Sequence, residues 1–189
     1  MPPSDPDKPG LAPAGFSRRS FLGGMAAVAG GLLLPPRRAL ASGERDVSLV
    51  HVHTGERLAV TYFGGGTYLA HGLRRVETFL RDFRTGERHP IDPALLDQLH
   101  GLRVKTGTSA PFQVISGYRS PRTNAALRAG GGGQARHSLH MQGRAVDVRL
   151  ADVSSAALRD AALELSLGGV GYYPADDFVH VDTGPVRRW

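Results

Sequence analysis

The chain of 189 residues contains no cysteine. Disulfide bonds and thiolate metal ligands are therefore excluded, and any metal ion has to be held by histidine and carboxylate side chains. No internal repeat is visible, and the length suits one domain with a hydrophobic core rather than two. These absences direct attention to the eight histidines and to the acidic residues near them.

The sequence also lacks a strong excess of charge of one sign. Lys and Arg number 23 against 17 Asp and Glu, for a net charge of +6. Residues 1–41 hold five of the basic and two of the acidic side chains, which leaves 18 and 15 for the remainder. No basic block interleaved with aromatic residues occurs, so we expect no nucleic-acid partner.

The N-terminal segment has no apolar run of the roughly 20 residues that a membrane-spanning helix needs. The run from Phe21 to Leu34 is short and glycine-rich, and Ser17–Leu22 (SRRSFL) resembles a twin-arginine export signal. Ala39–Ala41 fits a small-x-small cleavage site. We expect residues 1–41 to be the export signal and 42–189 the working domain in the periplasm, with membrane contact only if the signal stays uncleaved.

The first half of the domain combines strand and helix patterns. Alternating and β-branched residues predict a hairpin over Asp46 to Phe63, and apolar residues at helical spacing predict a helix over Leu69 to Phe83. A second helix is expected to run from Asp92, as its N-cap, through Pro93 to about Lys105.

The second half continues the α+β pattern. The expected elements are a buried strand (FQVISGY), a short helix capped by Ser120, a loop at Gly130–Gly133, a helix capped by Ser154 or Ser155, and two last strands (GVGYY and FVHVDTG). Tyr172 and Tyr173 alternate, so only one of them can face a cleft. The predicted fold is α+β, with a small antiparallel sheet and flanking helices.

Two of these strands place residues that bind metals on one face. In RAVDVRL, Val146 and Val148 point to one side and Asp147 to the other, and in FVHVDTG the same alternation separates Val179 and Val181 from His180. If the two strands lie near each other in one sheet, Asp147 and His180 can converge.

His140 lies seven residues before Asp147, close enough for a loop to return it to the same face. Two histidines and one carboxylate are a standard ligand set for catalytic zinc, with the fourth position left for water. The same spacing also occurs without a metal site, so the residue pattern alone leaves a purely structural interpretation open.

The motif Ser138-Leu-His140-x-x-Gly143-x-Ala145-x-Asp147, followed by His180, resembles the signature of a zinc metallopeptidase superfamily. That superfamily includes the D-Ala-D-Ala carboxypeptidases, phage endolysin peptidases and hedgehog domains. ISGYRS (115–120) is similar to a second element of the same group. More narrowly, HTGERLAVTYF, GYRSPRTNAAL and GVGYYPADDFVHVDTG resemble the YcbK-like family of exported murein endopeptidases, over nearly all of residues 47–189.

The resemblance implies a hedgehog and D-Ala-D-Ala carboxypeptidase-like fold with zinc held by His140, Asp147 and His180. Arg119 would orient the substrate and stabilise the oxyanion, which suits a fixed guanidinium in a partly dry cleft. Ser138 would support the substrate or the ligands.

The sequence offers two candidates for the group that carries the proton. Carboxypeptidase relatives have glutamate three residues before the last zinc histidine, where this chain has Asp177, whose side chain is one methylene shorter. Asp182, two residues after His180, is the alternative base, or it fixes the tautomer of that histidine. We prefer Asp177 as the base.

The resulting hypothesis is a zinc-dependent endopeptidase that acts on peptidoglycan peptides. The alternatives are a carboxypeptidase that trims a terminal D-amino acid and a non-catalytic, zinc-stabilised domain that binds the cell wall. Among the other histidines, His51 and His53 are expected to be exposed polar positions of the hairpin, and His137 to decorate its loop.

Overall fold

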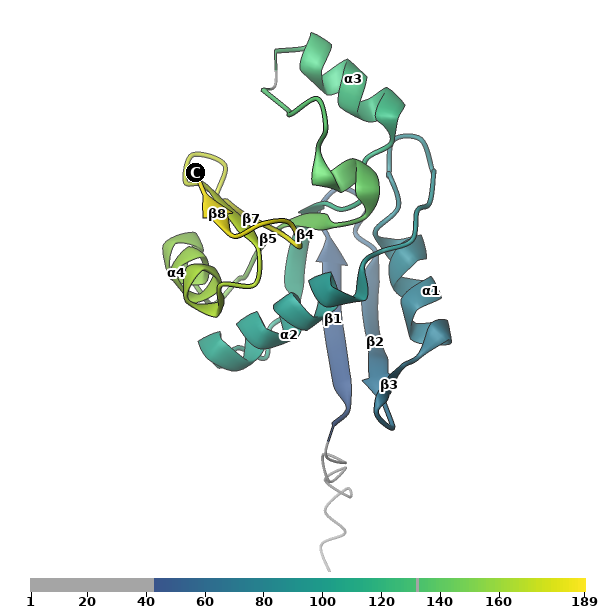
Figure 1. Ribbon diagram of the computed structural model, residues 1–189, viewed down its shortest axis with the longest axis vertical. Helices are drawn as coiled ribbons and strands as arrows, with labels where there is room; N and C mark the ends of the chain where they lie inside the picture. Colours follow the sequence, from purple (N-terminus) through teal and green to yellow (C-terminus); the bar gives the residue numbers. More distant parts are fainter. Residues whose placement is uncertain (1–42, 132) are drawn as a thin grey trace, which may run out of the picture. The chain divides into compact units, whose positions relative to one another are not determined.

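The computed structural model describes residues 43–131 and 133–189, so the predicted export signal and Gly132 lie outside the described residues. Figure 1 shows the order of the elements along the chain. They are β1 (Arg45–His51), β2 (Arg57–Gly64), β3 (Thr67–Tyr68), α1 (Ala70–Phe79), α2 (Pro93–Thr106), β4 (Phe112–Ser116), α3 (Pro121–Ala129), the short 3-10 helix η1 (Leu139–Gln142), β5 (Ala145–Arg149), α4 (Ser155–Leu165), β6 (Gly169–Tyr173), β7 (Phe178–Asp182) and β8 (Arg187–Arg188).

The strands form one sheet in the order β3-β2-β1-β4-β5-β7-β6-β8. The predicted α+β class is confirmed, but the sheet is larger than expected and is mixed rather than antiparallel. β1 pairs with β4 in parallel, because the chain crosses through α1 and α2 between them, and β6 pairs with β8 in parallel. All other neighbours are antiparallel.

The first predicted helix is shorter than its apolar periodicity suggested. It ends at Phe79, not at Phe83. The carbonyl of Leu80 accepts a hydrogen bond from the backbone N–H of Tyr118 at 2.7 Å, which draws the chain out of the helix. This approach needs Gly117, because a Cβ atom there would lie 2.7 Å from the Leu80 oxygen. A tertiary contact therefore overrides the local pattern.

The predicted caps are confirmed at three helices. The Asp92 carboxylate accepts from the N–H of Ala94 and Pro93 follows at the first turn of α2. The hydroxyl of Ser120 accepts from Thr123 at the start of α3, and Ser154, not Ser155, caps α4. Such a cap contributes about 1 kcal/mol to helix stability.

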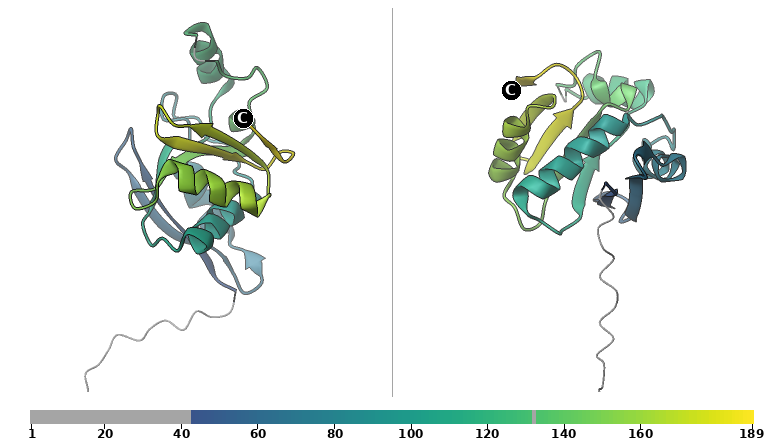
Figure 2. Two further views of the ribbon diagram at one scale, coloured as in Figure 1. Left: turned by 90° about the vertical axis from the view of Figure 1, so that its left-hand side faces the viewer. Right: turned by 60° about the horizontal axis from the view of Figure 1, so that its bottom comes forward.

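The core lies between the sheet and two helices that cross one of its faces. α2 and α4 contact each other and the strands, and they lie side by side in Figure 2. The fully buried side chains include four leucines of α2 and, from the sheet and α4, Val146, Val148, Leu158, Val179 and Val181. Because each buried aliphatic side chain contributes about 1.5–3 kcal/mol, the valines fix which face of β5 and β7 turns to the core. The other face is left for polar residues.

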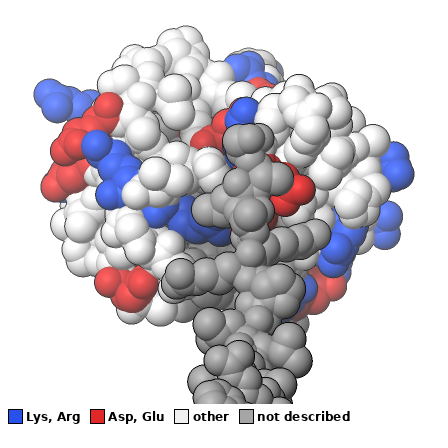
Figure 3. All heavy atoms as spheres, turned by 90° about the horizontal axis from the view of Figure 1, so that it is seen from below, with Lys and Arg blue, Asp and Glu red and all other residues white. Residues whose placement is uncertain are grey.

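Charged residues of both signs are interspersed on the face seen in Figure 3. Ion pairs at 2.5 Å join Arg45 to Asp97, Arg103 to Asp46, and Lys105 to Glu164. Each pair is partly exposed and contributes little to stability. Within residues 43–131 and 133–189, no helix is long and apolar enough to cross a bilayer.

Candidate metal centre

The register of β5 and β7 brings the first two expected ligands together. Asp147 lies directly opposite His180, with Val146 opposite Val181 and Val148 opposite Val179. Residues directly opposite on one face of an antiparallel pair have Cβ atoms about 5 Å apart. The alternation expected from the sequence therefore places the carboxylate beside the imidazole, on the face away from α2 and α4.

The third expected ligand, His140, comes from the 3-10 helix that precedes β5. Gly143 ends this helix with φ of +64°, and a Cβ atom there would lie 2.1 Å from the Pro90 oxygen. A residue with a side chain would be strained at such a φ and would not fit. The turn at Gly143 thus lets His140 fold back over the face of β5 that carries Asp147.

The three side chains meet in a buried cluster. Asp147 Oδ1 lies 2.8 Å from His180 Nδ1 and 3.3 Å from His140 Nε2, and the two nitrogen atoms are 3.2 Å apart. All three residues are at least nine-tenths buried. Among the described residues this is the one group of three or more metal-type ligands whose donor atoms lie within 4.8 Å of one another.

Partners outside the cluster engage one nitrogen of each histidine. His140 Nδ1 lies 2.8 Å from the carbonyl oxygen of Gly117, so this nitrogen carries the proton and Nε2 faces the cluster. His180 Nε2 faces Asp182 Oδ2 at 3.1 Å, and its Nδ1 faces Asp147 within the cluster. Partners of this kind orient histidine ligands of metal ions, so the donor set fits zinc.

The charges in the cluster shift the pKa values of its members. Burial would raise the pKa of Asp147, but His140 and His180 hold it well below its usual range. Burial would lower the pKa of His180, but hydrogen bonds with Asp147 and Asp182 raise it to about 9. The two carboxylates thus favour a positive charge at His180, and the histidines favour the ionised form of Asp147.

Arg119 lies beside the same carboxylate. Its Nη2 is 3.7 Å from Asp147 Oδ2 and 3.3 Å from the Ser116 hydroxyl, and its Nη1 is 3.5 Å from the Asn124 amide oxygen. The side chain is 7% exposed, and its Nε has no hydrogen-bond partner among the described residues. Burial lowers the pKa of Arg119, while Asp147 acts to raise it. A fixed guanidinium thus stands next to the cluster with a donor to spare.

Asp82 holds the loop that carries Arg119. The buried carboxylate accepts hydrogen bonds from the backbone N–H groups of Ser120 and Arg84, both at 2.9 Å. Burial would raise the pKa of Asp82, but hydrogen bonds from Thr123, Ser120 and Arg84 lower it to about 2. The carboxylate is therefore charged throughout the physiological pH range.

Replacing Asp82 with asparagine is expected to lower the free energy of unfolding by about 2 kcal/mol at pH 7, because a buried N–H loses its charged acceptor. Since the folded pKa lies below the unfolded one, this contribution is complete above about pH 4 and disappears as the pH falls towards 2. Urea unfolding of both proteins at several pH values measures it. Asp160→Asn, at an exposed site paired only with Arg159, is the control. A difference that does not shrink in acid would contradict this account.

The two aspartates near His180 have opposite environments. Asp182 is fully buried, and its oxygens accept from His180, from both terminal nitrogens of Arg187 and from the N–H groups of Gly169 and Gly184. Burial would raise its pKa, but the bonds from His180, Arg187 and Gly184 lower it below the usual range.

Asp177 is in the turn before β7, with φ of +51° and a side chain that is 62% exposed. Its nearest ionic partner is Arg149 Nη1, at 3.7 Å. No hydrogen bond or ion pair among the described residues joins Asp177 to the three clustered side chains. Its neighbour Phe178 does line the cleft beside the cluster.

A cleft of about 540 Å³ opens over the cluster. Ser138 and His137 line it from the loop before β5. Tyr173 also lines it, whereas Tyr172 lies under the guanidinium of Arg159 outside the cleft. Of the glycine loop, Gly133 reaches the cleft.

Among the cleft residues that the sequence did not reveal are Arg187 and Trp189. Arg187 begins the two-residue strand β8 and Trp189 follows it, and so short a strand has no hydrophobic periodicity. The expectation for His51 was wrong, because this side chain is 1% exposed and packs against Phe79 and Phe83. His53 is exposed as expected and stacks on Phe83, with ring centroids 4.6 Å apart.

The α+β fold is consistent with the peptidase class that the sequence motifs resemble, and the structure holds a buried cluster of two histidines and one aspartate. The chain belongs to the family described as "Peptidoglycan L,D-endopeptidase MepK", whose model matches residues 39–189. Peptidoglycan L,D-endopeptidase MepK of Escherichia coli (strain K12) is 43% identical over 169 residues, which cover 89% of this chain and 93% of the relative. A probable peptidoglycan L,D-endopeptidase MepK of Haemophilus influenzae is 37% identical over 173 residues, covering 89% and 91%. The resemblance drawn from the sequence is thus confirmed.

Proposed function

We propose that this chain is a zinc-dependent endopeptidase that cleaves peptide cross-links of bacterial peptidoglycan. The observation that carries the proposal is the buried cluster of His140, Asp147 and His180, in which each side chain offers one ligand atom and all three residues line a cleft. The relatives are named as peptidoglycan endopeptidases, and these names support the substrate class.

His140, Asp147 and His180 would hold the metal ion. When bound, zinc would polarise the scissile carbonyl and lower the pKa of water towards 7. Arg119 would bind the carbonyl oxygen and stabilise the negative charge that develops on it, since its guanidinium is fixed and shielded from water. Ser138, which also lines the cleft, would position the substrate.

We assign the two aspartates different roles. Asp182 holds His180 through Nε2, because both of its oxygens are engaged by protein donors and its pKa is lowered. Asp177 is proposed to take and return the proton, since its carboxylate is largely exposed beside the cleft-lining Phe178. Peptidoglycan lies outside the cytoplasmic membrane, so we place the protein in the periplasm, with residues 1–41 as a twin-arginine signal.

The test is incubation of the full chain with purified sacculi, with and without a chelator, followed by mass analysis of the muropeptides. An endopeptidase converts cross-linked dimers to monomers only without chelator. Release of single D-amino acids instead indicates a carboxypeptidase. Unchanged muropeptides with zinc bound would indicate a binding domain and refute the proposal.

The same assay separates the aspartates. Asp177→Asn is expected to lower kcat by about 10²–10⁴-fold with zinc affinity retained. Asp182→Asn is expected to weaken zinc affinity by about 10–100-fold in a chelator competition. Asp176→Asn, at the exposed neighbouring position, is the control. Full activity of Asp177→Asn would exclude that residue as the base.

A further inference from the structure

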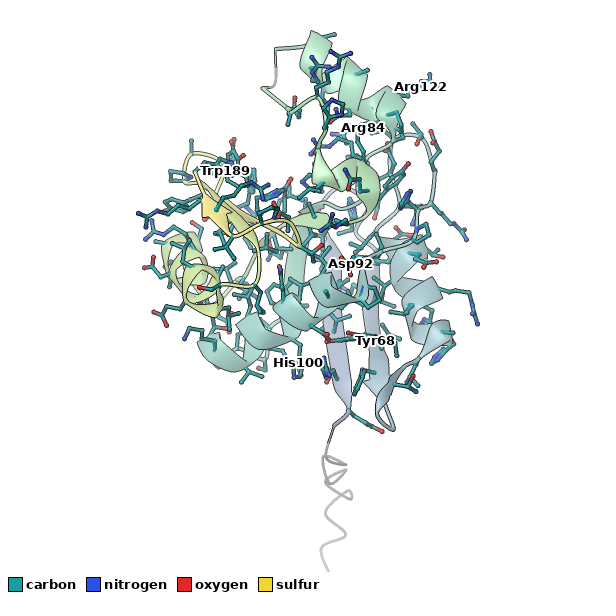
Figure 4. All side chains as sticks on the ribbon, in the orientation of Figure 1. Tyr68, Arg84, Asp92, His100, Arg122 and Trp189 are labelled. Carbon is teal, nitrogen blue, oxygen red and sulfur yellow. The ribbon has the colours of Figure 1, made fainter. Side chains whose placement is uncertain are left out.

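The only tryptophan of the chain lies beside the metal cluster. Trp189 continues β8 along β6, with its N–H bonded to the Val170 oxygen at 3.2 Å and its own oxygen accepting from Tyr172 at 3.1 Å. The indole lies on Gly171, where a Cβ atom would be 2.7 Å from the ring. Gly171 is opposite His180 in the sheet, so the indole and imidazole centroids are 5.2 Å apart. Figure 4 labels Trp189 at this edge.

Trp189 belongs to a fixed group of three rings. Its Nε1 donates to the Tyr173 hydroxyl at 2.9 Å, and the Tyr173 ring stacks on Phe178 with centroids 4.5 Å apart. Arg187 lies 4.8 Å from the indole centroid and is bonded to Asp182. These contacts hold the rings before any ligand arrives, so little conformational entropy is lost when one binds.

The two sides of the cleft differ in chemistry. The three rings, which we call the aromatic wall (Tyr173, Phe178 and Trp189), form one side, while Gln134, His137 and Ser138 on the loop before β5 supply polar groups. Although its indole packs on Gly171, Trp189 remains 51% exposed. An exposed apolar surface beside a polar site is suited to bind an apolar segment of the ligand.

A peptide cross-link supplies such a segment. A diamino acid can join two peptide chains through an amide at its second amino group, and a chain of methylene groups carries that amine. We propose that the aromatic wall is a subsite for the methylene chain of the diamino acid at the cross-link. This inference rests on the proposed function and names the part of the substrate that lies beside the metal cluster.

Steady-state kinetics on sugar-free cross-linked peptide dimers tests the subsite. Trp189→Ala is expected to raise KM about tenfold while kcat changes less than about threefold, and Trp189→Phe, which keeps a ring over Gly171, is expected to fall between. Leu167→Ala is the matched control, since Leu167 is 53% exposed and lies outside the cleft. An unchanged KM in Trp189→Ala, or a loss of kcat alone, would overturn the proposal.

A second substrate separates methylene binding from sugar stacking or a general structural role. For the wild-type protein, the KM should be higher for a dimer whose diamino acid has a shorter methylene chain than for the original dimer. For Trp189→Ala, the KM values of the two dimers should differ much less. Equal effects in both proteins would overturn the proposal, as would a defect that appears only with sugar-bearing substrates.

Fluorescence distinguishes failure of the subsite from failure of the proposed function. Adding the peptide dimer to the wild-type protein with chelator present should shift the emission of Trp189, and the short-chain dimer should need higher concentrations. If no product forms without chelator but this shift occurs, the proposed function fails while the subsite stands. If cleavage occurs without any shift, the subsite fails alone.

Discussion

Replacing His140 with alanine is expected to reduce cleavage of peptidoglycan cross-links by at least about a thousandfold, because losing a metal ligand removes several kcal/mol of transition-state stabilisation. The change should also reduce the zinc content of the purified protein from one ion per chain to well below one. Sacculus digestion and metal analysis of the same preparations measure both effects.

The fold should persist in this variant. The hydrogen bond from His140 to Gly117 is worth about 1 kcal/mol, much less than the stability of a domain. His71→Ala is the matched control, since His71 is exposed on α1 and outside the cluster. A His140→Ala protein that is folded, free of zinc and fully active would refute the metal site.

Replacing Arg119 with methionine is expected to lower kcat by about 10²–10³-fold, the usual effect of removing one donor that stabilises an oxyanion. Zinc affinity should change little, because Arg119 contacts Asp147 through Oδ2, whereas the histidines contact Oδ1. Kinetics on cross-linked dimers and a chelator competition test the two statements together.

Arg119→Lys should keep more activity than the methionine variant, since it retains the charge but lacks the planar, two-pronged donor. Arg122→Met is the control, because Arg122 is an exposed residue on α3, labelled in Figure 4, and is not a lining residue of the cleft. If the Arg119→Met protein loses its zinc or keeps its kcat, the guanidinium does not act on the substrate as proposed.

Much of the fold followed from local patterns. The hairpin, the start of α2 at Pro93, the cap at Ser120 and a cap at Ser154 or Ser155 were predicted because alternation, proline and capping hydroxyls act over a few residues. The sheet order and the parallel pairing of β1 with β4 were not predicted, since strand pairing depends on contacts between distant segments. The end of α1 at Phe79 was missed for the same reason, because it depends on the contact between Leu80 and Tyr118.

The same division applies to the metal cluster and its surroundings. The sequence by itself determined that Asp147 and His180 each lie on the face of their strand opposite the valines, because side chains alternate. That the two strands pair was decided by the tertiary structure. Only the tertiary structure decided that Asp182 is saturated by Arg187 and two backbone N–H groups, while Asp177 is exposed.

Trp189 shows why the tertiary structure was needed. The residue lies on the cleft because a short parallel strand places it over Gly171, and neither feature has a local signal. Periodicity reports which residues share a face, since it arises from the geometry of one element. The engagement of the carboxylate oxygens and the assembly of the aromatic wall depend on donors and surfaces from other elements. These elements meet only when the chain is folded.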